Sequence, residues 1–180
     1  MLRLFVCVWI PNEIKEKIIK FQNEMRELPI DANFVETENL HITVTFLGYK
    51  DLKEVEKIKS GVTVALKDMK KFNTRIKELK VIPNENYIRV IGISIEDENN
   101  LLANLIKKVA KEIGGDYYEK QKITLCRVKK IYDKAPVKDF IKKNTNIEIG
   151  SFEIDSVVLV KSVLTKHGPV YETIYRHQLM

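Results

Sequence analysis

Hydrophobic residues recur along this chain at two different spacings, and each spacing predicts one kind of secondary structure. Apolar side chains that return every three or four residues predict helices over about residues 11–28, 51–68, 97–113 and 134–144. Alternating residues or short apolar runs predict strands over about residues 4–10, 40–48, 73–82, 86–95 and 122–129. The last 30 residues predict one long hairpin, with arms over about 152–164 and 171–178 and a turn at 166–169.

The predicted strand at residues 40–48 carries the first candidate chemistry. In an extended chain, His41, Thr43 and Thr45 are expected on one face, and the opposite face, with Ile42, Val44 and Phe46, is expected toward a core. One imidazole and two hydroxyls in a row can all donate hydrogen bonds to an oxyanion such as phosphate. A histidine on a strand is more often structural, so this stretch alone does not establish a site.

Residues 122–129 repeat the same pattern 81 positions later. Lys122 and Thr124 stand where His41 and Thr43 stand in the first copy. A repeat of two indicates a duplicated unit, not a solenoid. Two such strands, related by a pseudo-twofold axis, could bring their polar faces together over a central groove and hold one substrate from both sides.

Helices and hairpins follow one another along the chain, with no linker, low-complexity segment or block of like charge between them. This order predicts an α+β fold, in which two antiparallel sheets carry helices on their outer faces. We expect residues 1–180 to form one two-lobed domain, with a pseudo-repeat and a soft division near residue 85.

Three motifs relate the chain to a known family. They are the His-x-Thr-x pattern at 41–44, its partner at 122–125, and a C-terminal run with Ser162, Leu164, Gly168, Pro169, Tyr171 and Glu172. Together they resemble the RNA 2′,3′-cyclic phosphodiesterases of the two-histidine phosphoesterase superfamily, whose members were long labelled 2′-5′ RNA ligases. The resemblance covers nearly the whole chain, and it implies a bilobal architecture.

The resemblance also implies roles for the first motif. His41 would protonate the leaving O3′ as a 2′,3′-cyclic phosphate opens to a 2′-phosphate, and Thr43 would donate a hydrogen bond to a non-bridging oxygen. Histidine suits proton transfer because its pKa lies near the working pH. Neither role requires a metal, and we expect no metal and no cofactor.

The second motif departs from the family, which places a histidine where this chain has Lys122. In the family that histidine activates the attacking water. A lysine with an ordinary pKa of about 10.4 is neutral in only roughly one molecule in 2,500 at pH 7, so it replaces a base poorly. Burial and nearby cations could lower that pKa, and a charged Lys122 would still bind phosphate.

Three further residues are candidates for the same site. Arg127 could bind the substrate phosphate beside Thr124, but it has the opposite strand parity and would face the groove only if a bulge or twist intervened; a structural ion pair is the alternative. His167 and Tyr171 belong to the C-terminal hairpin and could line the groove. For that turn, a plain hairpin connection is the simpler interpretation.

Composition describes a globular chain of 180 residues with 44% hydrophobic and 31% charged residues. The net charge of +6 favours an anionic partner, although the same lysines and glutamates could simply solvate the surface.

No stretch reaches membrane length, so we expect a cytoplasmic protein without a membrane partner. Cys7 and Cys126 lie in predicted strands and are expected to be buried free thiols.

The resemblance therefore implies an RNA 2′,3′-cyclic phosphodiesterase that acts on RNA ends or nucleotides with a 2′,3′-cyclic phosphate, and Lys122 predicts that its hydrolysis is impaired. We expect a monomer. His41 and Lys122 are expected to face each other across one cleft. Two alternatives stay open. One is a catalytically weak RNA- or nucleotide-binding module of the same fold, which Lys122 favours, and the other is an RNA-end 2′-5′ ligase.

Overall fold

The computed structural model describes every residue of the chain except residue 119. Its α-helices are α1 (Asn12–Arg26), α2 (Val55–Leu66), α3 (Leu101–Ile113) and α4 (Lys134–Asn144). Its strands are β1 (Leu2–Trp9), β2 (Ile30–Phe34), β3 (His41–Lys50), β4 (Phe72–Asn84), β5 (Tyr87–Glu96), β6 (Lys122–Ile131), β7 (Glu148–Ile154), β8 (Ser156–Thr165) and β9 (Gly168–Gln178). None of the helices in the described part of the chain combines the length and apolar character needed to span a bilayer.

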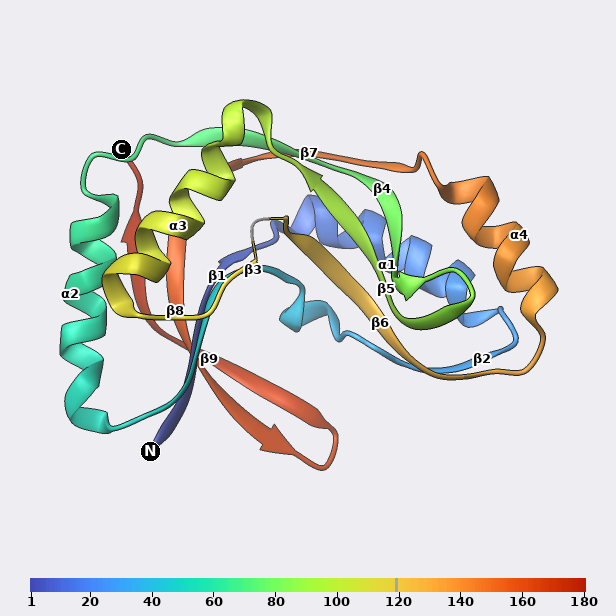
Figure 1. Ribbon diagram of the computed structural model, residues 1–180, viewed down its shortest axis with the longest axis horizontal. Helices are drawn as coiled ribbons and strands as arrows, with labels where there is room; N and C mark the ends of the chain where they lie inside the picture. Colours follow the sequence, from blue (N-terminus) through green and yellow to red (C-terminus); the bar gives the residue numbers. More distant parts are fainter. Residues whose placement is uncertain (119) are drawn as a thin grey trace.

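Two antiparallel sheets form the framework. The first sheet has the strand order β3-β1-β8-β9, and the second has the order β2-β6-β5-β4-β7. Helices α2 and α3 lie against the first sheet, and α1 and α4 lie against the second (Figure 1). The predicted α+β fold, with two antiparallel sheets and helices on their outer faces, is confirmed. We call the helix-free side of each sheet its inner face.

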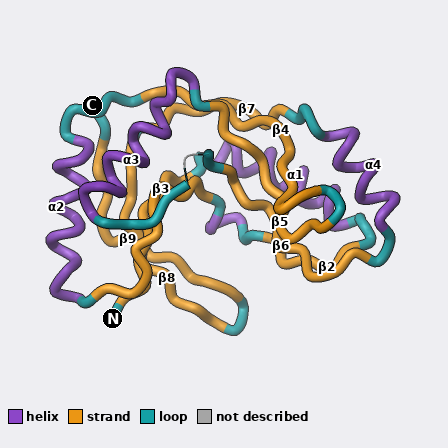
Figure 2. Tube along the Cα trace, viewed as in Figure 1, coloured by secondary structure: helices purple, strands orange, loops and turns teal. Residues whose placement is uncertain are grey.

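Both halves of the chain contribute to both sheets. Strands β8 and β9 join β1 and β3 in the first sheet, and β4 pairs with both β5 and β7 in the second. Residue 85 lies in the turn between β4 and β5. Helix α1 packs on the second sheet, where the rings of Phe21 and Phe140 stack at 5.4 Å. The tube view shows how the chain passes repeatedly between the two lobes (Figure 2). This exchange ties the two sheets together.

The helices form where the sequence supplies both an apolar face and end signals. In α1, Ile14, Ile18 and Met25 point into the core, and Pro11 stands before the first helical residue. Gly114 follows the last residue of α3, and its positive φ of 72° closes the last turn without steric cost. Cys7 and Cys126 are free and buried, which confirms that prediction.

Strands β3 and β6 are structural copies of each other. Residue by residue, they have the same order of half-buried, buried and exposed side chains, which matches the 81-residue offset of the two motifs. Each strand also contains, at the equivalent position, an extra residue that has no partner on the neighbouring strand. That residue is Val44 in β3 and Leu125 in β6.

The bulge at Val44 corrects one prediction from the sequence. Thr45 does not share a face with His41 and Thr43; it is fully buried, and its hydroxyl donates to the carbonyl of Asp116. Phe46, which was expected in the core, is 46% exposed. The extra residue reverses the alternation of faces, which simple two-residue counting cannot detect.

The prediction of the C-terminal hairpin was also wrong in its first arm. Residues 148–154 form β7, which pairs with β4 in the second sheet, and β8 then begins at Ser156 in the first sheet. The chain crosses from one sheet to the other at Asp155. Phe152 and Ile154 before the crossing and Val158 and Val160 after it fall in one two-residue register, so the sequence pattern alone resembles one uninterrupted strand.

A buried side chain of α1 supports the bulge in β6. Gln22 is 3% exposed, and its amide nitrogen donates to the carbonyl of Leu125, the bulged residue, and to the carbonyl of Val35, both at 3.0 Å. The backbone N–H of Val35 donates to the same Leu125 carbonyl at 2.9 Å. Buried carbonyls without partners are costly, so Gln22 stabilises the bulge.

We predict that Gln22→Leu, which keeps the volume but removes the donor, lowers the free energy of unfolding by about 1–3 kcal/mol. Urea denaturation followed by circular dichroism measures this change. Asn23→Leu, one position along and exposed, is the matched control and should change stability by less than about 0.5 kcal/mol. Equal stability of the Gln22→Leu variant and the parent would contradict the role of Gln22.

Candidate active site

The first group of candidate residues lies on the inner face of the first sheet. His41 begins β3, and its ring contacts three aromatic rings, with centroid distances of 5.2 Å to Phe5, 6.0 Å to Trp9 and 5.6 Å to Tyr171. Phe5 and Trp9 come from β1, and Tyr171 comes from β9. Residues of β1 therefore build an aromatic wall behind the imidazole.

Hydrogen bonds define which ring nitrogen of His41 can exchange a proton with a substrate. Nδ1 lies 2.6 Å from the carbonyl oxygen of Asn39, and because a carbonyl only accepts, Nδ1 carries a proton and donates it. Nε2 lies 3.1 Å from the hydroxyl of Thr43. Nε2 is therefore the nitrogen that can exchange a proton with a substrate, and Thr43 lies beside it.

Asn39 is a positioning residue that the sequence did not indicate. It is 7% exposed, its backbone carbonyl orients His41, and its side-chain amide donates to the carbonyl of Pro169 at 2.9 Å. It therefore connects the imidazole to the β8–β9 hairpin, which carries Tyr171. The signal that was available, a short polar turn before the strand, is common to many loops.

Burial lowers the pKa of His41 below its ordinary value of 6.5, and the hydrogen bond to Asn39 opposes this effect. Desolvation disfavours the charged imidazolium, so the free site holds a largely neutral ring at neutral pH. Tyr171 is also affected by its surroundings: burial raises the pKa of its phenol, while the charges of Arg3 and Arg127 act in the opposite direction.

The second group lies on the inner face of the second sheet. Lys122 begins β6, Thr124 follows on the same face, and both are half-buried. Because Leu125 is an extra residue, the alternation of faces reverses and Arg127 joins them on the inner face. The bulge that Arg127 was predicted to need is therefore present.

Burial lowers the pKa of Lys122 below its ordinary value, and the charge of Arg127 lowers it further. The stem of Lys122 passes over Gly92 of β5: a Cβ at Gly92 would lie 3.3 Å from Cδ of Lys122 and 2.7 Å from the carbonyl of Ile123. Gly92 therefore allows the lysine to lie flat on the sheet. Sequence reasoning did not find this glycine, because it lies in another strand.

The two groups approach each other. Strand β3 contacts β6 near the centre of the molecule (Figure 1). Arg127, from the second sheet, is close enough to Tyr171, from the first, for its charge to act on the phenol. Tyr171 in turn contacts His41. The charge of Arg127 acts on Lys122 as well, so Arg127 lies within electrostatic range of both groups.

His167 does not belong to either group. It is exposed in the β8–β9 turn, four residues from Tyr171, or roughly 13 Å along an extended strand. The structure thus brings together His41, Thr43 and Tyr171 on one sheet and Lys122, Thr124 and Arg127 on the other. Among the described residues, no cluster of three or more His, Cys, Asp or Glu side chains has metal-binding geometry.

We predict that the pKa of His41, measured by NMR titration of its ring protons, lies below 6.5 in the free protein. Since the unfolded chain then binds this proton more tightly than the folded chain, stability should fall as the pH drops below about 6.5. Bound inorganic phosphate should raise the pKa, because the anion favours the imidazolium. A His41 pKa at or above 6.5 in the free protein would contradict this assignment.

Comparisons with known proteins identify a family. Residues 8–92 match the family model described as LigT-like phosphoesterase. A protein from Methanocaldococcus jannaschii named RNA 2′,3′-cyclic phosphodiesterase is 38% identical, over 96% of this chain and 98% of its own. A protein of the same name from Aquifex aeolicus is 30% identical, over 97% of this chain and 95% of its own.

Solved structures share the fold. A protein from Thermus thermophilus superimposes with a TM-score of 0.80 at 24% identity, covering 99% of this chain and 98% of its own. Escherichia coli LigT in complex with 3′-AMP superimposes with a TM-score of 0.78 at 19% identity, with the same coverage. At these identities the likeness concerns the fold alone.

Proposed function

Because this chain belongs to the LigT-like phosphoesterase family, we propose that it is an RNA 2′,3′-cyclic phosphodiesterase, which opens terminal cyclic phosphates to 2′-phosphates. The observation that carries this proposal is the equivalence of β3 and β6, whose first residues are His41 and Lys122. The names of the relatives from Methanocaldococcus jannaschii and Aquifex aeolicus support the same activity.

Four groups would bind the reacting phosphate. The hydroxyls of Thr43 and Thr124 donate to non-bridging oxygens, while Lys122 supplies a compact positive charge and Arg127 a planar one with several donors. Positive charge matters most in the transition state, where negative charge accumulates on the phosphate oxygens. These side chains and His41 supply both charge and a proton, so the proposed reaction requires no metal.

His41 would act as the general acid. A water molecule attacks phosphorus, the bond from phosphorus to O3′ breaks, and protonated Nε2 of His41 gives its proton to O3′. The proton that the water loses goes to solvent. The buried environment that lowers the pKa of His41 makes the imidazolium a stronger acid, but it leaves fewer molecules protonated at neutral pH. The positive charges of the second motif do not favour that protonation either.

The absence of a histidine at position 122 would slow the reaction. A charged lysine cannot accept a proton from water, and the lowering of the Lys122 pKa by burial and Arg127 only partly offsets this. A positioned base contributes about 10² to 10⁴ in rate. We therefore propose firm binding of cyclic-phosphate ends with slow hydrolysis.

A second candidate function follows from the same lysine. A site whose second motif offers only donors is well suited to hold an RNA end or a nucleotide without cleaving it. In this case the protein is a binding module that retains the fold of the family. Turnover separates the two functions, because a binding module gives no product above the rate of the uncatalysed reaction.

We predict that Lys122→His raises kcat for a cyclic-phosphate oligonucleotide by about 10²-fold with little change in KM, because it restores a base without altering the other contacts. His41→Ala should remove the remaining activity. Product formation followed by chromatography measures both variants. A parent enzyme that already turns over as fast as Lys122→His would show either that the pKa of Lys122 is low enough for it to act as the base or that another group supplies the base.

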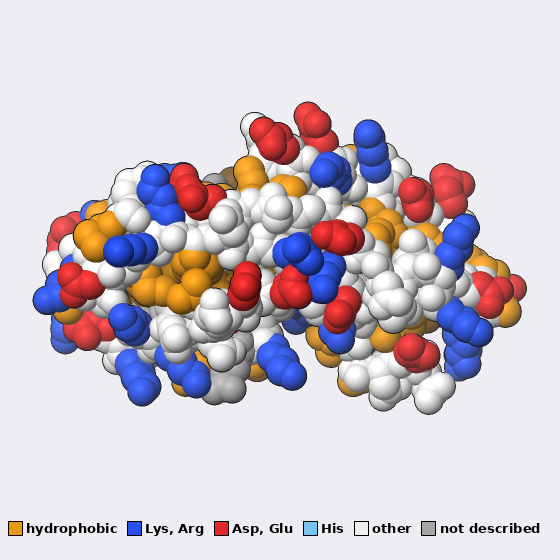
Figure 3. All heavy atoms as spheres, turned by 90° about the horizontal axis from the view of Figure 1, so that it is seen from above, with side chains coloured by type: hydrophobic (Ala, Val, Ile, Leu, Met, Phe, Trp, Pro, Cys, Tyr) orange, Lys and Arg blue, Asp and Glu red, His pale blue; other side chains and the backbone are white. Residues whose placement is uncertain are grey.

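We also predict that the affinity for RNA ends falls steeply with salt. Each phosphate neutralised by a lysine or arginine releases counterions, which gives a slope of about −0.7 per contact in a plot of log affinity against log salt. Basic and acidic side chains are intermixed over the face seen in Figure 3, so the net charge of +6 is not concentrated there. A slope near zero would mean that the basic residues only solvate the surface.

A further inference from the structure

A cavity of about 570 Å³ lies on the inner face of the second sheet, beside the candidate active site. It is lined by β4, β5, the start of α3 and the segment before β6. Its lysines are Lys80, Lys107 and Lys120, and its neutral polar residues include Ser94, Asn104 and Gln121. Its volume falls within the range of about 300–1,000 Å³ that is usual for small-molecule sites.

Strand pairing connects this cavity directly to the second motif. Ser94 lies opposite Lys122 on neighbouring antiparallel strands, so their Cβ atoms are about 5 Å apart. Lys80 lies opposite Gly92, and Gly92 lies opposite Thr124, which places Lys80 two strands, or about 10 Å, from Thr124. The stem of Lys122 lies over Gly92, between the two sites.

The lining suits a phosphate and a sugar. Three lysines, three amide residues and one serine line the cavity, and no aromatic ring lines it among the described residues. Asp97 also lines it, but its two carboxylate oxygens accept the backbone N–H groups of Leu102 and Ala103 at 2.7 and 2.9 Å. A carboxylate oxygen of Glu78, Oε2, lies 3.9 Å from Nζ of Lys80, and this exposed ion pair is a weak interaction.

We propose that this cavity binds the phosphate on the 5′ side of the terminal nucleotide, so that the protein selects the ends of RNA chains over cyclic mononucleosides. The inference rests on the proposed function, because it takes the reacting phosphate to lie between His41 and Lys122. A nucleoside 2′,3′-cyclic phosphate with a free 5′-hydroxyl has no second phosphate. An RNA end always has one, a single nucleotide away from the reacting group.

Three ligands isolate this second phosphate: a nucleoside 2′-phosphate, the same compound with an added 5′-phosphate, and a dinucleotide that ends in a 2′-phosphate. These are products, so their dissociation constants can be measured by calorimetry whether or not hydrolysis is fast. We expect the second and third ligands to bind about tenfold more tightly than the first, since each gains contacts with two lysines. Equal affinity of all three ligands would overturn the proposal.

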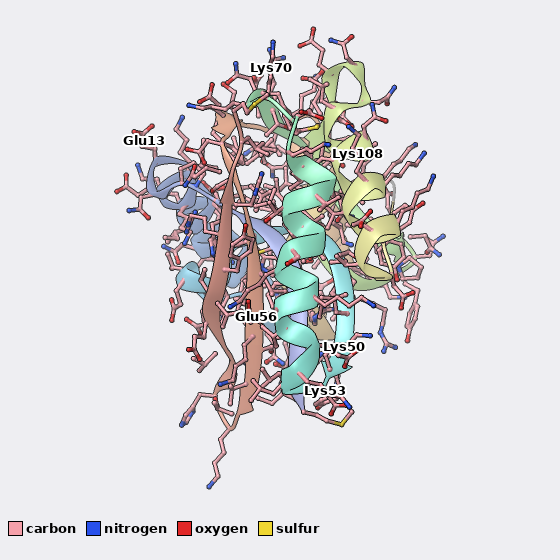
Figure 4. All side chains as sticks on the ribbon, turned by 90° about the vertical axis from the view of Figure 1, so that its left-hand side faces the viewer. Glu13, Lys50, Lys53, Glu56, Lys70 and Lys108 are labelled. Atoms are coloured by element: carbon pink, nitrogen blue, oxygen red, sulfur yellow. The ribbon has the colours of Figure 1, made fainter. Side chains whose placement is uncertain are left out.

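Variants then locate the contact. Lys80→Met and Lys120→Met, made singly and together, should weaken the second and third ligands and leave the first unchanged. Each substitution should also reduce the salt slope for the dinucleotide by about 0.7. Lys53→Met is the matched control, because Lys53 lies just before α2 in the outer helical layer (Figure 4), and it should change none of the three affinities.

The result also distinguishes this proposal from the proposed function. If the protein does not hydrolyse cyclic-phosphate oligonucleotides but still binds the second and third ligands more tightly than the first, the result counts against the phosphodiesterase and leaves the cavity assignment standing. Hydrolysis with the same kcat/KM for cyclic mononucleosides and cyclic-phosphate oligonucleotides would refute the cavity assignment and leave the phosphodiesterase standing. A loss of affinity for the dinucleotide in Lys53→Met equal to that in Lys80→Met would also refute it.

Discussion

One extra residue in β6, the bulged Leu125, determines which side chains of the strand can reach a substrate. Its carbonyl accepts the backbone N–H of Val35 and the buried amide of Gln22. Because of this bulge, Arg127 lies on the same face as Lys122 and Thr124. The equivalent bulge at Val44 exposes Phe46 and buries Thr45 in the other sheet. A helix on the far side of the sheet thus supplies a second donor to the bulge that shapes the candidate site.

The exchange of elements between the two lobes makes this arrangement a rigid one. Each sheet takes strands from both halves of the chain, and β7 passes directly into β8 across the two sheets. The two motif strands cannot move apart without disturbing both cores. Sites built on strands hold side chains more firmly than sites built on loops, which suits a reaction that depends on charge and proton donors at set positions.

Most of the fold could be predicted from the sequence, since the helices, the β4–β5 hairpin and the paired motif strands have clear periodicity. The duplication also indicated His41, Thr43, Lys122 and Thr124. The faces beyond each bulge could not be predicted, because an extra residue changes the parity without changing the composition. Asn39 and Gly92 were missed for a different reason: their importance comes from neighbours in other segments, and no local pattern records it.

The chemistry that results is unequal on the two sides of the site. His41 is enclosed by aromatic rings, and its pKa lies below its ordinary value. The ammonium group of Lys122, near the charge of Arg127, donates hydrogen bonds but accepts none. The central claim is that both sides hold one phosphate. A crystal structure with a bound nucleoside 2′-phosphate tests it most directly. The account predicts one phosphate within hydrogen-bonding distance of both His41 Nε2 and Lys122 Nζ; a phosphate held by only one of the two strands would contradict it.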